Sequence, residues 1–133
     1  MDYQQPDFYH FAEDSIRLVQ VATKFSREFY HSRFDVLDLC AGSGVCGIEF
    51  ALNNQNVSKI DFVEKNEKFI PYLKTNLGII SCPHKVHHLD YKDHEKKYDL
   101  VLCNPPYFSS EKNRLCEDLD KRRAKFISKI HTF

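Results

Sequence analysis

The sequence has 133 residues, enough for one domain with a single hydrophobic core. Basic residues (Lys and Arg) and acidic residues (Asp and Glu) number 19 each, so no overall charge attracts the chain to nucleic acid or to a membrane surface. The first ten residues lack the basic and then apolar pattern of a signal peptide, and no apolar run reaches the roughly 20 residues of a membrane span. These features predict a cytoplasmic protein without a membrane partner.

Helical and strand patterns alternate along the chain. The first helix is predicted over 12–25, where apolar residues recur at three-residue steps. The elements expected after it are a strand over 35–40, a helix over 44–54, a strand over 59–64, a helix over 66–78, strands over 85–90 and 98–103, and a final helical stretch over 114–130. In the helix over 66–78, Asn66 is the expected N-cap and Gly78 the expected residue just after the end. Pro71 is expected to kink that helix or to cost it a hydrogen bond.

Strands that alternate with helices pair in parallel, and right-handed crossovers then give a doubly wound α/β sheet. We therefore predict a Rossmann-like fold with an N-terminal helix, in a single domain. Its parts are a leading helical segment over 1–33, a ligand-binding core over 34–110 and a basic helical segment over 111–133. Ligands of such sheets bind beyond the carboxyl ends of the strands.

The first predicted strand runs into the segment DLCAGSGVCG. Gly42, Gly44 and Gly47 match the pattern G-x-G-x-x-G between a strand and a helix, and Glu64 ends the next strand about twenty residues later. Glycines let a ligand approach main-chain N–H groups, and the carboxylate can accept hydrogen bonds from both ribose hydroxyls. The pattern fits NAD as well as other adenosine cofactors, and a tight turn without a ligand is the alternative.

Asp38 discriminates between these cofactors. It precedes the glycines, where a dinucleotide would place its pyrophosphate, and a carboxylate repels phosphate but attracts an ammonium group. S-adenosylmethionine (SAM) carries an ammonium and a sulfonium and has no phosphate, so SAM is the expected cofactor. Asp90, at the end of the third strand, is placed to accept a hydrogen bond from an adenine amino group, with a solvated aspartate in a turn as the alternative.

The segment NPPYF follows the fourth predicted strand, which lies beside the first in a doubly wound sheet. The Asn104 side-chain oxygen and the Pro105 carbonyl can both accept hydrogen bonds from one –NH2 group, and neither Pro105 nor Pro106 has an N–H to compete. Tyr107 and Phe108 offer rings for a flat substrate. Two acceptors localise the nitrogen lone pair and favour its attack on a methyl sulfonium. A proline strand terminator over a core aromatic residue is the alternative.

Together, DLCAGSGVCG, the strand end at Glu64, LDY at 89–91 and NPPYF resemble class I SAM-dependent methyltransferases of the amino-methylating group. QQPDFYHFAEDSIRLV and NPPYF followed by RRAKF resemble the bacterial tRNA adenine-N6 methyltransferases of the small-domain family, whose typical helix start is matched by Phe11 and Asp14. The same motifs resemble release-factor glutamine methyltransferases, because glutamine and adenine present the same –NH2 group. The resemblance covers nearly the whole chain.

This resemblance implies roles for the matching residues. The implied cofactor-binding residues are Asp38, Cys40, Ala41, Gly42, Gly44, Glu64, Lys65, Asp90, Tyr91 and Asn104, with Asp38 and the glycines at the methionine end of SAM, Glu64 at the ribose and Asp90 at the adenine. The implied catalytic residues are Asn104, Pro105, Pro106 and Tyr107, and the implied substrate-binding residues are Tyr107, Phe108, Arg122 and Arg123.

The chain departs from the family in its strand count. The family's fold has seven strands, whereas only four are predicted before Phe133, so we expect a sheet truncated at its C-terminal end. The fourth strand is apolar, and an unpaired apolar edge is a template for association. Self-association through that edge is therefore expected.

Cysteine and histidine residues give no sign of a disulfide or a metal site. The five cysteines are odd in number and widely spaced, which indicates reduced thiols, and Cys40 and Cys46 are interpreted as packing residues. A cluster drawn from Cys82 and the nearby histidines is disfavoured because strand alternation sends His87 and His88 to opposite faces. No metal is predicted.

Three functions remain open. The first is methylation of an adenine N6 in tRNA, which the basic segment suits because residues 111–133 hold three more basic than acidic residues, although a solvated helix face would suit that charge equally. The second is methylation of a glutamine in a release factor or another protein. The third is a truncated module that binds SAM and is inactive alone.

Overall fold

The computed structural model describes residues 3–6, 13–94, 96–104 and 125–128. The helices are α1 (Glu13–Phe29), α2 (Val45–Asn53) and α3 (Ile70–Asn76), with short 3₁₀ helices η1 (Leu77–Ile79) and η2 (Tyr91–Asp93). The strands are β1 (Phe34–Leu39), β2 (Val57–Val63), β3 (His84–His87), β4 (Leu100–Cys103) and β5 (Lys125–Ser128). None of these described helices is long and apolar enough to cross a membrane.

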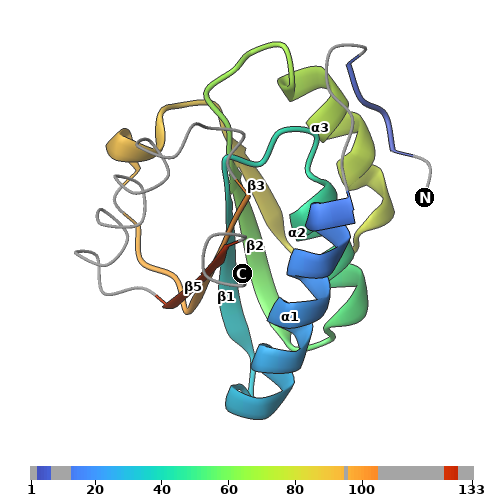
Figure 1. The fold of residues 1–133 in the computed structure, drawn as a ribbon. Coiled ribbons are helices and arrows are strands. Elements are labelled where there is room, and N and C mark those ends of the chain that lie inside the picture. The colour runs from blue at the N-terminus through green and yellow to red at the C-terminus, as the bar shows by residue number, and fades with distance from the viewer. Residues whose placement is uncertain (1–2, 7–12, 95, 105–124, 129–133) are drawn as a thin grey trace.

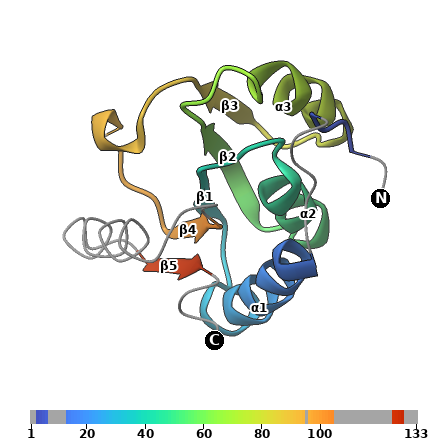
Figure 2. The ribbon, with the colours of Figure 1, turned by 45° about the horizontal axis from the view of Figure 1, so that its top comes forward.

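The strands form one sheet in the order β3-β2-β1-β4-β5, and every pairing is parallel. Helices α1, α2 and α3 lie together against one face of this sheet (Figure 1, Figure 2). The order reverses at β1, since the chain proceeds outward to β2 and β3 and then returns to the other side of β1 as β4. This arrangement confirms the predicted Rossmann-like fold, and it creates a ligand-binding position at the carboxyl ends of β1 and β4.

Two hydrophobic clusters cover the two faces of the sheet. The larger cluster packs the sheet against the helices, and its strand residues are Phe34, Val36, Val57, Ile60, Phe62, Leu100 and Leu102. The smaller cluster lies on the opposite face and consists of Leu37, Leu39, Val63, Tyr98, Val101 and Cys103. Successive residues of a strand point to opposite faces, so the apolar runs of β1 and β4 serve both clusters. Both faces of the central strands are therefore buried.

The prediction of four strands was wrong by one. The stretch over 114–130 was expected to be helical, yet Lys125–Ser128 forms β5, which pairs with β4 from Leu100↔Lys125 to Cys103↔Ser128. Backbone pairing at a distant sheet edge overrides the partial helical periodicity of this short segment. The outer edge of β4 is thus occupied, so the predicted self-association through that edge is also wrong.

Helix α3 begins later than the sequence predicted. Its N-cap is Phe69, so Pro71 lies in the first turn, where a proline costs no helical hydrogen bond. Asn66 does not cap the helix, and its Oδ1 instead accepts a hydrogen bond from the Lys68 N–H at 3.0 Å. Gly78 does not terminate the helix either, because the chain continues as η1 through that residue. The expected kink is therefore absent.

Gly47 lies where helix α2 crosses β1 and β2 at close range. A Cβ atom at this position would lie 2.5 Å from Cε1 of Phe62 and 2.8 Å from Oδ2 of Asp38. Both distances are shorter than van der Waals contact, and both neighbours are buried. Glycine is therefore required for the helix to approach the sheet this closely.

We predict that Gly47→Ala lowers the free energy of unfolding by about 1–3 kcal/mol, because the added methyl group must displace Phe62 or Asp38. Gly78→Ala is the matched control, since a Cβ at Gly78 meets no atom within 4 Å and its φ is not positive. That variant should be neutral or more stable by up to about 1 kcal/mol. Urea denaturation of the two variants measures the difference, and equal stability would contradict this packing account.

Candidate functional site

A cavity lies at the carboxyl ends of β1, β2 and β4. Its lining includes seven of the residues singled out from the sequence, namely Asp38, Cys40, Ala41, Gly42, Glu64, Lys65 and Asn104. It also includes residues that sequence reasoning did not select as site residues, namely Gln5, Ser15, Ser43, Val45, Cys46, Asn66 and Phe69. Segments from the N-terminal region, three strand ends and the start of two helices thus surround one hollow.

The turn after β1 has an unusual backbone. Cys40 has φ 58°, Gly42 has φ 58° and Gly44 has φ 88°, which places all three in the left-handed region. Gly44 donates its N–H to the Ala41 carbonyl at 2.9 Å and is the N-cap of α2. Left-handed geometry is costly for a residue with a side chain, and such residues concentrate at ligand sites. We therefore regard Cys40 as part of the site through its backbone conformation.

Glu64 holds two turns together at the end of β2. Its Oε1 accepts a hydrogen bond from the Gly42 N–H at 2.8 Å, and its Oε2 accepts one from the Asn66 N–H at 2.8 Å. A carboxylate has about four acceptor positions, so these two bonds leave capacity for the hydroxyls of a ribose. The same side chain can shape the glycine turn and face a ligand.

Asp38 is a buried carboxyl group on the cavity wall. Only 2% of its surface is exposed, and its Oδ2 accepts a hydrogen bond from the Gly47 N–H at 2.9 Å. Burial raises the pKa of Asp38 to about 8; the Gly47 hydrogen bond lowers it, and the charge of Glu64 raises it further. In the described part of the chain, the salt bridges involve Asp61 and not Asp38. A cationic ligand would supply the missing countercharge.

Two buried polar atoms point to a ligand. Among the described residues, the buried side-chain atoms without a hydrogen-bond partner are Ser43 Oγ and Asn104 Oδ1, and both residues line the cavity. Asn104 Nδ2 donates to Ser15 Oγ at 2.9 Å, which leaves Oδ1 as the acceptor for another molecule. Because buried polar groups are normally paired, these two atoms indicate a ligand with hydrogen-bond donors.

Some predicted residues lie elsewhere. Asp90 and Tyr91 are not among the lining residues. Asp90 Oδ1 accepts a hydrogen bond from the Lys92 N–H at 3.1 Å and caps η2, and Tyr91 packs against the smaller hydrophobic cluster. Gly44 shapes the turn without lining the cavity. The predicted residues Pro105, Pro106, Tyr107, Phe108, Arg122 and Arg123 lie outside the described residues.

Comparison with known families identifies the family of this chain. The model of the methyltransferase small domain family matches residues 17–124, which is most of the chain. The chain belongs to this family. Its cofactor is SAM, which agrees with the prediction from Asp38 and the glycine turn.

Several characterised methyltransferases resemble the chain. The release factor glutamine methyltransferase of Borreliella burgdorferi is 28% identical over 69% of this chain and 32% of its own length. The tRNA1(Val) (adenine(37)-N6)-methyltransferase of Erwinia tasmaniensis is 32% identical over 56% of this chain and 33% of its own length. The chain thus spans about a third of the length of these relatives. The 16S rRNA N2 G1207 methyltransferase of Thermus thermophilus shares the fold, with a TM-score of 0.61 and 19% identity over 77% of this chain and 28% of that one.

The lining residues of this small-domain methyltransferase fit SAM. The buried Asp38 carboxylate suits the ammonium group, and Glu64 suits the ribose hydroxyls. The unpaired Ser43 Oγ and Asn104 Oδ1 add polar partners on the same wall. A dinucleotide would place its phosphates beside the Asp38 carboxylate, so NAD remains disfavoured.

We predict that SAM binding releases a proton from Asp38. With a pKa of about 8 the group is mostly protonated at pH 7, and a cationic ligand favours the ionised form. Affinity should therefore rise as pH increases from about 6 to about 8. Calorimetry at pH 7 in two buffers of different ionisation enthalpy measures the protons released.

Asp38→Asn should lose the proton release and weaken SAM binding, whereas Asp93→Asn, which alters an exposed carboxylate outside the cavity, should leave both unchanged. The SAM amine titrates in the experiments with the wild type and with both variants. The difference in proton release between these proteins therefore reports on Asp38. Identical proton release from wild type and Asp38→Asn would rule out this role.

Proposed function

We propose that the chain is part of a SAM-dependent N-methyltransferase that methylates an exocyclic amino group, with adenine N6 in tRNA as the favoured acceptor. The single observation that carries this proposal is the buried Asn104 Oδ1, which has no hydrogen-bond partner among the described residues and belongs to a residue that lines the SAM cavity. An acceptor oxygen at this position is suited to an –NH2 group. The Asp38 carboxyl group lines the same cavity.

Residues of the chain contribute positioning and not strong base catalysis. SAM supplies an activated methyl group bonded to a sulfonium. Asn104 Oδ1 would accept one N–H of the substrate and orient the nitrogen lone pair toward the methyl carbon. Transfer would form the N–C bond as the C–S bond breaks, the electron pair of the C–S bond would go to the departing sulfur, and the nitrogen would then give its extra proton to water. Pro105, Pro106 and Tyr107 are proposed from the sequence to complete the acceptor clamp.

A tRNA adenine is favoured by two observations. The Erwinia relative, named for adenine-N6 methylation of tRNA, matches at 32% identity. The stretch over 111–133 has an excess of basic residues, and Arg122 and Arg123 are proposed to contact phosphates. A base must be flipped or splayed to present its amino group. Since tRNA is a cytoplasmic molecule, we also propose that the protein acts in the cytoplasm.

A release-factor glutamine is the second candidate. It is supported by the Borreliella relative, which matches a larger part of the chain than the tRNA enzyme does. A glutamine amide presents the same –NH2 group to Asn104, so the described cavity accommodates both chemistries. The third candidate is a module that binds SAM without transferring a methyl group.

Incubation with methyl-labelled SAM and either bulk tRNA or release factor distinguishes these functions. We expect the label in adenine of the tRNA. Label in a glutamine of the release factor would establish the second candidate. SAM binding without transfer to either substrate would contradict the proposed activity.

We further predict that Asn104→Ala reduces methyl transfer at saturating SAM by about 10²–10³-fold, by analogy with the loss of one polar group that stabilises a transition state. The variant should remain folded, because Asn104 is only partly buried and follows the end of β4. Asp93→Asn is again the control and should transfer methyl groups at the wild-type rate. Wild-type activity in Asn104→Ala would exclude the proposed role of the amide.

A further inference from the structure

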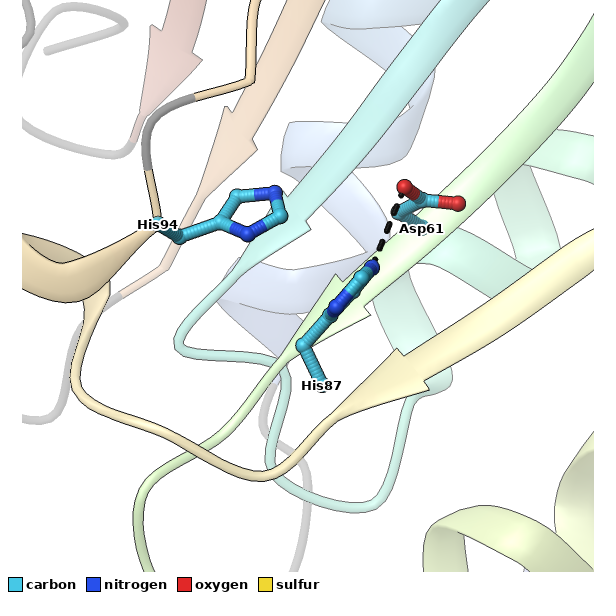
Figure 3. A group of neighbouring side chains, drawn as sticks. All are labelled: Asp61, His87 and His94. Carbon is cyan, nitrogen blue, oxygen red and sulfur yellow. Dashed lines mark hydrogen bonds and ion pairs between the residues drawn. The ribbon is translucent and has the colours of Figure 1, made fainter.

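A second group of polar side chains lies on the other face of the sheet. Asp61 is on β2 between Ile60 and Phe62, which both pack toward the helices, so alternation directs Asp61 to the opposite face. Asp61, His87 and His94, called here the Asp61 cluster, converge from β2, from the end of β3 and from the residue after η2 (Figure 3). None of the three lines the SAM cavity.

We propose that the Asp61 cluster is a zinc site. Each residue offers one ligand atom, and these three atoms lie within 4.8 Å of one another. Two imidazoles and one carboxylate form a donor set that zinc commonly takes in proteins, with a fourth position left for water or another ligand. No part of the cofactor chemistry proposed above requires these side chains.

One pair of donors in the cluster has the spacing of tetrahedral coordination. Two donors on a zinc ion at about 2.0–2.1 Å lie roughly 3.3 Å apart, and His87 Nε2 lies 3.2 Å from Asp61 Oδ2. The rings of His87 and His94 are neighbours, with their centroids 4.4 Å apart. Asp61 and His94 are buried, whereas His87 is partly exposed and provides a route for an ion. Zinc binding requires the three donors, which lie within 4.8 Å of one another, to close to that spacing.

Tyr98 occupies the cluster in the metal-free protein. Its hydroxyl donates to Asp61 Oδ2 at 2.6 Å and lies 2.6 Å from His94 Nε2. This O–H satisfies the two ligand groups, so the protein can fold without the ion. Zinc would replace this hydrogen bond by direct coordination, and Tyr98 is therefore a competitor and not a required ligand.

Lys96 is a second competitor. Its Nζ lies 3.6 Å from Asp61 Oδ2, and 45% of its side chain is exposed. A long exposed lysine can move into solvent at little cost. Removal of this positive charge should therefore strengthen zinc binding, whereas a purely structural hydrogen-bond network would gain nothing from the change.

Zinc in this position would join Asp61 on β2 to His87 and His94, which follow it by 26 or more residues in the sequence. It would link the connection between β3 and β4 to the sheet face that carries the smaller hydrophobic cluster. Ions that bind the folded state and not the unfolded state raise stability by mass action. The expected consequence is a higher melting temperature with zinc, independent of SAM.

The test is a zinc titration of the full chain after treatment with a chelator, measured by calorimetry in competition with a chelator of known affinity. We expect one zinc ion per chain. His94→Ala and Asp61→Asn should each weaken binding by at least about tenfold. Asp61→Asn preserves side-chain shape and an acceptor for Tyr98, so it remains informative if His94→Ala does not fold.

His84→Ala and His88→Ala are the matched controls, because both histidines are exposed, belong to the same part of the chain and lie outside the cluster. They should bind zinc as the wild type does. Tyr98→Phe should retain zinc, and Lys96→Ala should bind it more tightly. Cobalt substitution should give a visible spectrum typical of nitrogen and oxygen ligands.

Several results would overturn the proposal. The first is a wild-type protein that binds no stoichiometric zinc. The second is an equal loss of zinc affinity in His84→Ala and His94→Ala. The third is a loss of zinc binding in Tyr98→Phe. Thiolate charge-transfer bands with cobalt would also overturn it, since they would assign the metal to cysteines.

Discussion

The hydrogen bond from the Gly47 N–H to the Asp38 carboxyl group connects the packing of the protein to its chemistry. It forms only because Gly47 lacks a side chain and α2 can lie directly against β1 and β2. The same close approach buries Asp38 and removes its carboxylate from water. A buried carboxylate without a basic partner is unfavourable, and a cationic ligand such as SAM offsets that cost. Ligand preference thus originates in how a helix packs on a sheet.

The remaining site residues are organised around the same strand ends. Glu64 holds the glycine turn and the start of the next connection through two backbone N–H groups, so the cavity is largely formed without a ligand. Ser15 of α1 accepts a hydrogen bond from the amide nitrogen of Asn104, which fixes the orientation of this side chain in the cavity lining. Side chains that are already positioned before the ligands bind favour both binding and methyl transfer, because little further ordering is required.

Sequence patterns predicted the parts of the fold that depend on local order. The apolar runs that form β1, β2 and β4 and the glycine turn with Asp38 and Glu64 were recognisable because spacing along the chain carries their signal. β5 was not predicted, because its pairing with β4 is a contact between distant segments, and the sequence of four residues alone does not indicate such a contact. The Asp61 cluster was missed for the same reason: Asp61 and His87 are 26 residues apart and meet only when β2 pairs with β3. The hydrogen bond between Asn104 and Ser15 likewise joins segments that are distant in sequence.

A crystal structure of the protein with SAM, or with its demethylated product, tests the central claim most directly. The account predicts the amine of the ligand within hydrogen-bond distance of Asp38, the ribose hydroxyls on Glu64, and Asn104 Oδ1 open toward the methyl group. A ligand bound with its amine in solvent, or with a different edge of the sheet as its site, would contradict the claim that the buried carboxylate selects the cofactor.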